Sequence, residues 1–147
     1  MVKKGSQLIN AVTNSLVPHL TIIIGASYGA GTYAMSGRAF NNRFTFIWPS
    51  AKIAVMGGKQ IAGVMSIVRR GRAARKGEAF DEEADARLVA AVEAVQEKGS
   101  VALEASGAIS DDGIIDPRDT RTVLGICLSV VRNKPVEGAA GYGVFRL

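Results

Sequence analysis

A short β-branched run that leads directly into a glycine-rich turn constrains this chain more than any other feature. The run Thr-Ile-Ile-Ile at residues 21–24 is typical of a buried strand and is much too short to cross a membrane. Glycines stand at positions 25, 29 and 31, and the following stretch predicts a helix over residues 30–40. Because glycine lets a ligand approach the backbone closely, unpaired N–H groups at the start of such a helix form a pocket for negative charge. That charge could belong to a phosphate, a carboxylate, or an oxyanion formed during a reaction.

The same turn also satisfies a dinucleotide-binding pattern, because residues 29–34 match GxGxxG/A after a predicted strand. A dinucleotide site needs a carboxylate about 20 residues further on, to hold the ribose hydroxyls. The first acidic residue of any kind is Glu78, and Ala51 and Lys52 stand in a strand-like context where an Arg for a 2′-phosphate would be needed. A nucleotide site is therefore disfavoured, and a tight turn that only packs a helix on a sheet stays a further alternative.

Charge is divided unevenly along the 147 residues. Residues 1–77 carry 11 Lys and Arg and no acid, whereas residues 78–147 carry all 13 acids and 7 bases. This asymmetry predicts a positive field around the glycine turn, which would attract an anionic ligand or partner. The basic run at residues 69–77 favours a solvated helix end, and phosphate binding is the alternative. The other bases are dispersed and no aromatic platform accompanies them, so we do not expect a nucleic-acid partner.

Side chains that commonly carry chemistry are scarce in this sequence. Cys127 is the only cysteine, which excludes an internal disulfide and fits a reducing cytoplasm. It lies in an apolar helical pattern and is interpreted as a small core residue rather than a nucleophile. His19 is the only histidine, and its place beside Pro18 favours a structural role over that of a base. With no Ser/His/Asp set and no Cys/His cluster for a metal, any chemistry must rely on backbone dipoles and on the ligand itself.

The remaining pattern predicts helices and strands in alternation, with nothing long enough for a membrane helix. Asp116 and Pro117 form a clear helix start, and adjacent Asp111 and Asp112 are assigned to a turn because neighbours on an extended segment point to opposite faces. An alternating apolar tail at 138–147 should pack on a neighbour. A helix and strand at the very start look like a chain that begins midway through a larger fold. The predicted helices span residues 3–16, 59–70, 81–98, 102–105 and 116–131, and the predicted strands span 44–48, 52–56 and, interrupted, 109–115.

Five blocks in order along nearly the whole chain resemble one family, the carboxyltransferase (beta) subunits of biotin-dependent acyl-CoA carboxylases. The resemblance covers the propionyl-, acetyl- and methylcrotonyl-CoA types, and the last two blocks look most like the methylcrotonyl-CoA type. The blocks are GASYGAG at 25–31, MSGRAF at 35–40, WPSAKIAVMGG at 48–58, DDGIIDPRDTR at 111–121 and YGVFRL at 142–147.

The resemblance implies a crotonase-like α/β fold, a spiral of repeated strand–strand–helix units. It also implies that residues 1–147 are the C-terminal, biotin-side domain of a subunit whose acyl-CoA domain lies elsewhere. In the family, carboxybiotin releases CO₂, the biotin enolate takes the α-proton of the acyl-CoA, and an oxyanion hole in each domain stabilises one enolate.

Carried over residue by residue, the hole of this domain falls on the backbone N–H groups of Ala30 and Gly31, which would hold the ureido oxygen of biotin. The family often has Gly-Ala there, so the order is reversed in this chain and the register could slip by one. The implied wall of the biotin pocket consists of Ser27, Tyr28, Gly29, Met56 and Gly57, and no metal is implied.

The implied partners are the biotin carboxylase and biotin carrier (alpha) subunit, acyl-CoA as substrate, and further copies in a hexamer. The implied compartment is the bacterial cytoplasm or the mitochondrial matrix. The domain alone should be inactive and should self-associate through exposed apolar surface. Alternatives are another crotonase-fold enzyme acting on CoA thioesters, a biotin-dependent decarboxylase subunit, and a phosphate- or dinucleotide-binding module.

Overall fold

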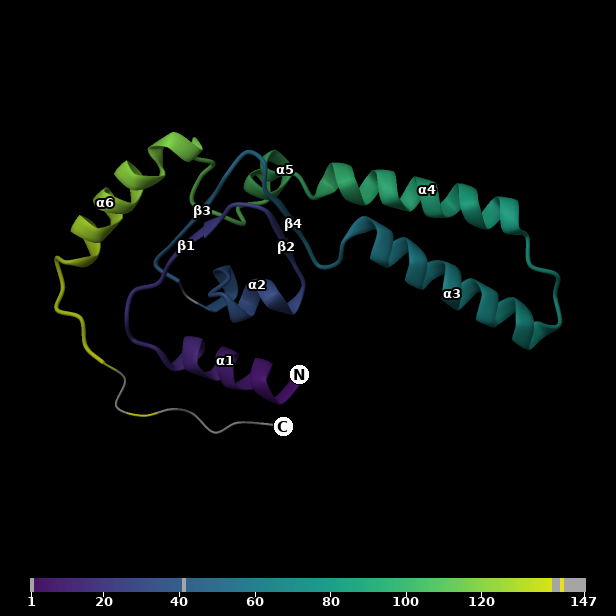
Figure 1. The fold of residues 1–147 in the computed structure, drawn as a ribbon, viewed down its shortest axis with the longest axis horizontal. Helices are drawn as coiled ribbons and strands as arrows, with labels where there is room; N and C mark the ends of the chain where they lie inside the picture. Colours follow the sequence, from purple (N-terminus) through teal and green to yellow (C-terminus); the bar gives the residue numbers. More distant parts are fainter. Residues whose placement is uncertain (1, 41, 139–140, 142–147) are drawn as a thin grey trace.

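Two small parallel sheets lie at the centre of the computed structural model, which describes residues 2–40, 42–138 and 141 (Figure 1). Strand β1 (Leu20–Ile23) pairs with β3 (Phe44–Ile47), and β2 (Ala26–Tyr28) pairs with β4 (Lys52–Ala54). Both strands of the first pair are rich in β-branched and aromatic residues, which suit a pleated and partly buried surface. In β3 the inward positions are Thr45 and Ile47, so the strand shows the expected alternation.

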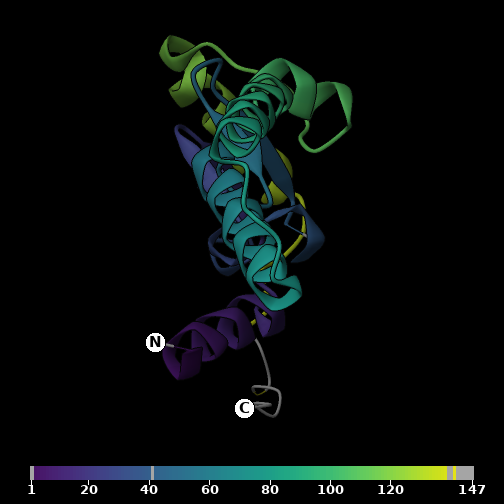
Figure 2. The same ribbon diagram turned by 90° about the vertical axis from the view of Figure 1, so that its right-hand side faces the viewer.

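Each pair of consecutive strands is followed by a helix, so β1, β2 and α2 form one unit and β3, β4 and α3 form the next. Helices α3 and α4 lie side by side and project from the sheets, as Figures 1 and 2 both show. The helices are α1 (Val2–Asn14), α2 (Ala30–Ala34), α3 (Gly58–Lys76), α4 (Glu82–Gly99), α5 (Ala102–Gly107) and α6 (Thr120–Val131), with 3₁₀ turns at Arg38–Phe40 and Pro117–Asp119.

The fully buried core of the described residues is small and lies where α5 meets β3. Ile47, Ala51, Ala102 and Ala105 form it, and Ile23 and Ile53 pack against it. Many large apolar side chains on the outer faces of α3 and α6 are exposed instead, including Ile67 at 70% and Ile126 at 61%. In helix α6 only Cys127 is buried, as predicted for that residue. No helix in the described part of the chain has the length and apolar character needed to span a bilayer.

Several predicted elements differ from the observed ones at their ends. The predicted strand 21–24 is shifted back by one residue, because Leu20 pairs with Phe44 whereas Ile24 is exposed. The predicted helix 30–40 stops at Ala34, because Ser36 adopts a left-handed φ of 63° that no helix can continue through. Strand 52–56 ends at Ala54, and the predicted strand 109–115 contributes only one isolated bridge, from Ile114 to Ile47.

One helix start was predicted correctly from its cap residue, and one helix end was not. Asp116 caps its helix by accepting the Arg118 N–H at 2.8 Å, as predicted. The helix predicted over 59–70 instead continues through the basic run as α3 and ends at Gly77, whose φ of 70° forms a left-handed C-cap. The tail predicted to pack on a neighbour lies outside the described residues except for 138 and 141.

Two arginines of the basic run form ion pairs with acids of α4 where α3 meets α4. Arg69 donates to the buried Asp85 at 2.8 Å, and the Ser66 hydroxyl donates to the same carboxylate. Arg70 forms a bidentate pair with Glu82 and lies over the Phe80 ring, 4.5 Å from its centre. Arg69 and Arg70 therefore fasten the α3–α4 hairpin, while Arg72 and Arg75 of the same basic run are exposed. The positive field around the glycine turn stays a prediction.

Candidate functional site

Gly29 is the residue that sets the geometry of the glycine turn. Its φ of 62° and ψ of −142° belong to a region that side chains with a Cβ rarely adopt, and a Cβ there would lie 3.1 Å from the Val55 carbonyl oxygen. Its N–H donates to the Ala54 oxygen at 3.1 Å, which extends the β2–β4 pairing into the turn. The backbone of α2 therefore starts directly beside the end of β4.

The first two amides of α2 are free to meet a ligand. Among the described residues, no acceptor takes the N–H of Ala30 or of Gly31, whereas the next amide, that of Thr32, donates to the Gly29 oxygen at 3.2 Å. This is the expected state of the first amides of a helix, which have no partner inside it. Both residues are exposed, and a Cβ at Gly31 would meet nothing within 4 Å. The two predicted oxyanion donors are thus adjacent, unpaired and accessible.

A cavity of about 390 Å³ lies at this turn. Its wall combines the backbone of the turn with apolar side chains from the end of β4, and Val55 among them is 85% exposed. The lining residues are Gly29, Ala30, Thr32, Tyr33, Ile53, Ala54 and Val55.

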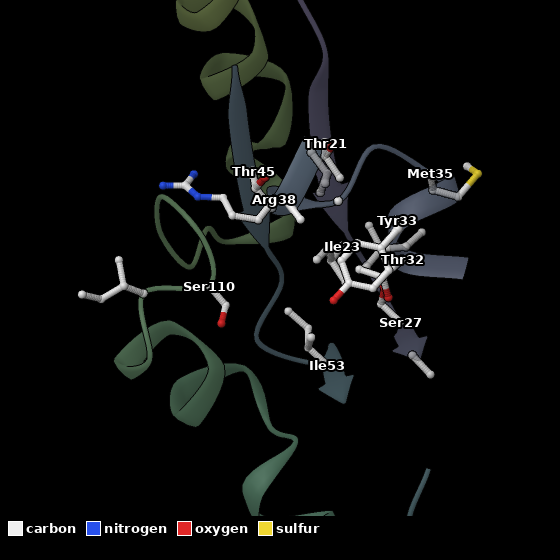
Figure 3. A pocket seen from close by; sticks show the side chains of 17 residues that line it. Thr21, Ile23, Ser27, Thr32, Tyr33, Met35, Arg38, Thr45, Ile53 and Ser110 are labelled. Atoms are coloured by element: carbon white, nitrogen blue, oxygen red, sulfur yellow. The ribbon is translucent and has the colours of Figure 1, made fainter. Parts of the chain in front are cut away.

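A second cavity, of about 590 Å³, lies next to the first and shares Thr32, Tyr33 and Ile53 with it. Figure 3 shows Ser27, Thr32 and Tyr33 grouped on one side of it, with Ser110 facing them from the loop after α5. The hydroxyls of Ser27 and Thr32 lie 2.7 Å apart and share a hydrogen bond, which joins β2 to the first turn of α2. Ser27 therefore lines a cavity beside α2, and its place in the wall of a biotin pocket stays a prediction.

The predicted pocket-wall residues fall into two groups. Ser27 and Gly29 line the cavities just described. Tyr28 instead packs toward Gly57, where an added Cβ would lie 3.3 Å from the tyrosine ring. Gly57 is the buried N-cap of α3, and Met56 is 38% exposed just before it. Parallel pairing of β2 with β4 thus brings both predicted stretches to the same edge of the sheet.

Sequence reasoning missed part of the cavity wall. Thr32, Tyr33 and Val55 were not predicted to line it, because strand β2 is only three residues long and was interpreted as loop. Its pairing with β4, which places Val55 beside Gly29, was therefore not foreseen. The available signal was the repeated order of strand, strand and glycine turn in residues 20–31 and 44–58.

An ion pair lies beside the second cavity, where Arg38 is one of the lining residues. Arg38 donates to Asp112 at 2.7 Å, and the Thr45 N–H donates to the same carboxylate at 2.8 Å. Partial burial opposes ionisation of Asp112, but these hydrogen bonds and the charge of Arg38 outweigh it and hold the pKa of Asp112 below its usual value. Asp111 is buried and accepts from the Ser106 hydroxyl, so the two carboxylates do face different partners, as the sequence predicted. No group of three or more His, Cys, Asp or Glu suited to a metal occurs among residues 2–40, 42–138 and 141.

Comparisons with known proteins agree on one family. The model of the carboxyl transferase domain family matches residues 1–141. The whole chain is 58% identical to 28% of a probable biotin-dependent acyl-coenzyme A carboxylase beta2 subunit of Mycobacterium tuberculosis, and 43% identical to 25% of the mitochondrial methylcrotonoyl-CoA carboxylase beta chain of Arabidopsis thaliana. The structure of the P. aeruginosa geranyl-CoA carboxylase beta subunit is also similar, with a TM-score of 0.80 and 39% identity over 99% of this chain and 27% of that one. The chain therefore spans about a quarter of the length of these relatives, and its fold is the crotonase-like fold that the resemblance implied.

Proposed function

The chain belongs to the carboxyl transferase domain family, and on this premise we propose that it is part of the biotin-side domain of a carboxyltransferase subunit in an acyl-CoA carboxylase. The reaction would transfer CO₂ from carboxybiotin to the α-carbon of an acyl-CoA. The observation that carries the proposal is the pair of unpaired amides at Ala30 and Gly31 beside a partly apolar cavity. Two adjacent N–H donors are what a developing oxyanion requires.

The residues at the turn fit a biotin head group. A ureido oxygen is a hydrogen-bond acceptor, and the amides of Ala30 and Gly31 are donors with no partner among the described residues. Glycine at position 29 removes the Cβ that would otherwise strike Val55, and the space in front of Gly31 is open. When bound, carboxybiotin supplies the CO₂ that is transferred. The chain itself supplies orientation and the two donors, and it needs no acid or base of its own.

The dinucleotide alternative fits this geometry less well. A dinucleotide site places its pyrophosphate at the start of a long helix within a βαβ unit, where the whole helix contributes to the favourable field. Helix α2 ends after five residues. The strands that precede and follow it, β2 and β3, belong to different sheets. A backbone hole for one oxygen atom needs only the first turn of a helix.

The partners follow from the relatives. Their names describe beta subunits or beta chains of biotin-dependent carboxylases, and we infer an alpha subunit that carries biotin as the physiological partner. The solved transcarboxylase 12S protein is described as a hexamer, and exposed apolar side chains on α3 and α6 are suited to assembly with further copies. By analogy with these relatives, we place the protein in the bacterial cytoplasm or the mitochondrial matrix.

The proposal is tested with Ala30→Pro in the full-length subunit, assembled with its biotin-bearing partner. Proline is well accommodated at the first position of a helix, so this change removes one N–H with little other disturbance. Loss of one oxyanion donor lowers kcat by about 10²- to 10³-fold. Carboxylation of acyl-CoA gives kcat, and calorimetric titration with acyl-CoA gives its affinity, which should not change.

Ala30→Gly is the matched control, since it alters the same side chain and keeps the N–H. We expect it to retain activity within a few-fold. Full activity of Ala30→Pro, or loss of acyl-CoA affinity together with activity, would show that the turn is only structural.

A further inference from the structure

Helix α2 is too short to fix its own direction. With five residues it holds few internal hydrogen bonds, and isolated helices of this length are not stable in water. The direction of its first amides is therefore set by how the two ends of the helix are attached. At the first end, the Gly29 N–H donates to Ala54 of β4, and Ser27 of β2 contacts Thr32.

At the other end the chain passes through Ser36, which is the centre of a small hydrogen-bond network. The Thr21 hydroxyl donates to the Ser36 carbonyl oxygen at 2.9 Å, and the Asn42 side-chain amide donates to the same oxygen at 3.1 Å. The Ser36 hydroxyl and His19 Nδ1 share a further hydrogen bond of 2.9 Å. We refer to Ser36, His19, Thr21 and Asn42 together as the Ser36 hub.

The hub holds a backbone conformation that would not persist without support. Ser36 has a φ of 63°, which is uncommon outside glycine and persists only where the surroundings enforce it. Ser36 and Asn42 are 8% and 9% exposed, so water competes little for their hydrogen bonds. Such strain is frequent where a fold must aim a functional group.

The hub also connects α2 to a different sheet from the one that holds its start. Thr21 belongs to β1, and the His19 carbonyl oxygen accepts the Arg43 N–H at 2.8 Å just before β3. Asn42 further donates to the Thr45 hydroxyl of β3. Helix α2 is therefore fixed to the β2–β4 sheet at its first residue and to the β1–β3 sheet just beyond its last.

We propose that the Ser36 hub positions the Ala30 and Gly31 amides for the reaction, with His19, Thr21 and Asn42 as positioning residues. This inference rests on the proposed function of those amides. If one attachment is released, the short helix rotates about the other, and the donors turn away from the reacting oxygen. Misplacement by about 1 Å can lower a rate about 100-fold.

The test compares Thr21→Val with Thr21→Ser in the full-length subunit assembled with its biotin-bearing partner. Valine keeps the shape and strand preference of threonine but removes the donor, whereas serine keeps the donor. We expect Thr21→Val to lower kcat by about 10- to 100-fold, with the KM for acyl-CoA and the stoichiometry of acyl-CoA binding unchanged. Thr21→Ser should restore kcat to within about threefold of the parent, since the donor hydroxyl is regained.

A double variant separates positioning from general destabilisation. In the Ala30→Pro background one of the two aimed donors is already absent, so adding Thr21→Val should lower kcat by much less than it does alone. If Thr21 acts only on stability, the two losses multiply, and the inference is overturned. If Ala30→Pro lowers kcat and Thr21→Val does not, the hub inference fails while the proposed function stands. If Ala30→Pro itself has no effect, the proposed function fails first.

A second pair of variants covers the case in which Thr21→Val does not assemble. His19→Asn places an amide nitrogen near the position of Nδ1, and His19→Leu removes all hydrogen bonding there. Loss of kcat in His19→Leu with recovery in His19→Asn supports the hub. Equal activity of the two variants contradicts it.

Discussion

Replacing Gly29 by alanine should loosen α2 at its N-cap without altering the free amides of Ala30 and Gly31. The native φ and ψ of Gly29 lie in a region that is almost closed to other residues, and holding alanine there costs about 1–3 kcal/mol. The new Cβ would also stand 3.1 Å from the Val55 oxygen, so β4 must move by a few tenths of an ångström. Both effects weaken the bond from the Gly29 N–H to Ala54.

Hydrogen–deuterium exchange, followed by mass spectrometry of peptides that cover residues 28–36, measures this loosening directly. A loss of 1–3 kcal/mol in local stability accelerates exchange about 5- to 150-fold. Gly31→Ala is the matched control, because its Cβ meets nothing within 4 Å and its φ is not in the left-handed region. Unchanged exchange in Gly29→Ala, or equal acceleration in both variants, would refute the argument that backbone geometry at position 29 holds α2.

Three further predictions concern the parts that support the site. Asp112→Asn should destabilise the full-length subunit by roughly 1 kcal/mol at pH 7. The folded pKa of Asp112 is lowered, so its stabilisation is present above the unfolded value of about 3.9 and is lost as pH falls through the folded value. Urea unfolding should therefore show the difference between the two proteins shrinking from pH 5 toward pH 3, and a constant difference would contradict this origin. Burial, and then the charge of Asp112, raise the pKa of the Cys127 thiol. Iodoacetamide should therefore alkylate the native protein much more slowly than the unfolded protein at pH 8. Equal alkylation rates would show that the thiol is exposed to solvent. Asp85→Ala should lower the free energy of unfolding by about 1–3 kcal/mol and accelerate proteolysis within the α3–α4 hairpin, because it removes the buried partner of Arg69. Glu83→Ala, on the exposed side of α4, is the control and should have little effect.

The general pattern of the fold was accessible from sequence wherever one local rule decided the structure. Asp116 followed by proline fixed a helix start, and the β-branched run at 21–24 fixed a strand to within one residue. Strand β2 was missed because three residues carry no periodicity, and its existence depends on pairing with β4, which lies 26 residues further along. The early end of α2 was missed for a similar reason, since side chains from β1 and the β3 turn hold Ser36 in its left-handed conformation.

The site was accessible in part. The glycine turn predicted free amides, and the structure has them. The neighbouring cavity wall depends on which strand lies beside the turn, and that is decided by packing across both sheets. The ion pairs of Arg69 and Arg70 were not predicted either, because they form only when α3 and α4 pack against each other.

The large exposed surface also shows why helical periodicity did not predict which apolar side chains are buried in this chain. It exposes 10289 Å², against about 7,200 Å² for a compact monomer of the same mass. Apolar residues such as Ile67 and Ile126 follow helical periodicity correctly but face outward. Such exposed apolar side chains are suited to contacts with further chain segments or with other subunits.

Fastening α2 to a separate sheet at each end leaves the two donors without a hinge. Turning the Ala30 and Gly31 amides would require both sheets to shift together, because α2 is attached to one at its N-cap and to the other just beyond its last residue. The direction of these two amides is therefore among the least adjustable features of the glycine turn.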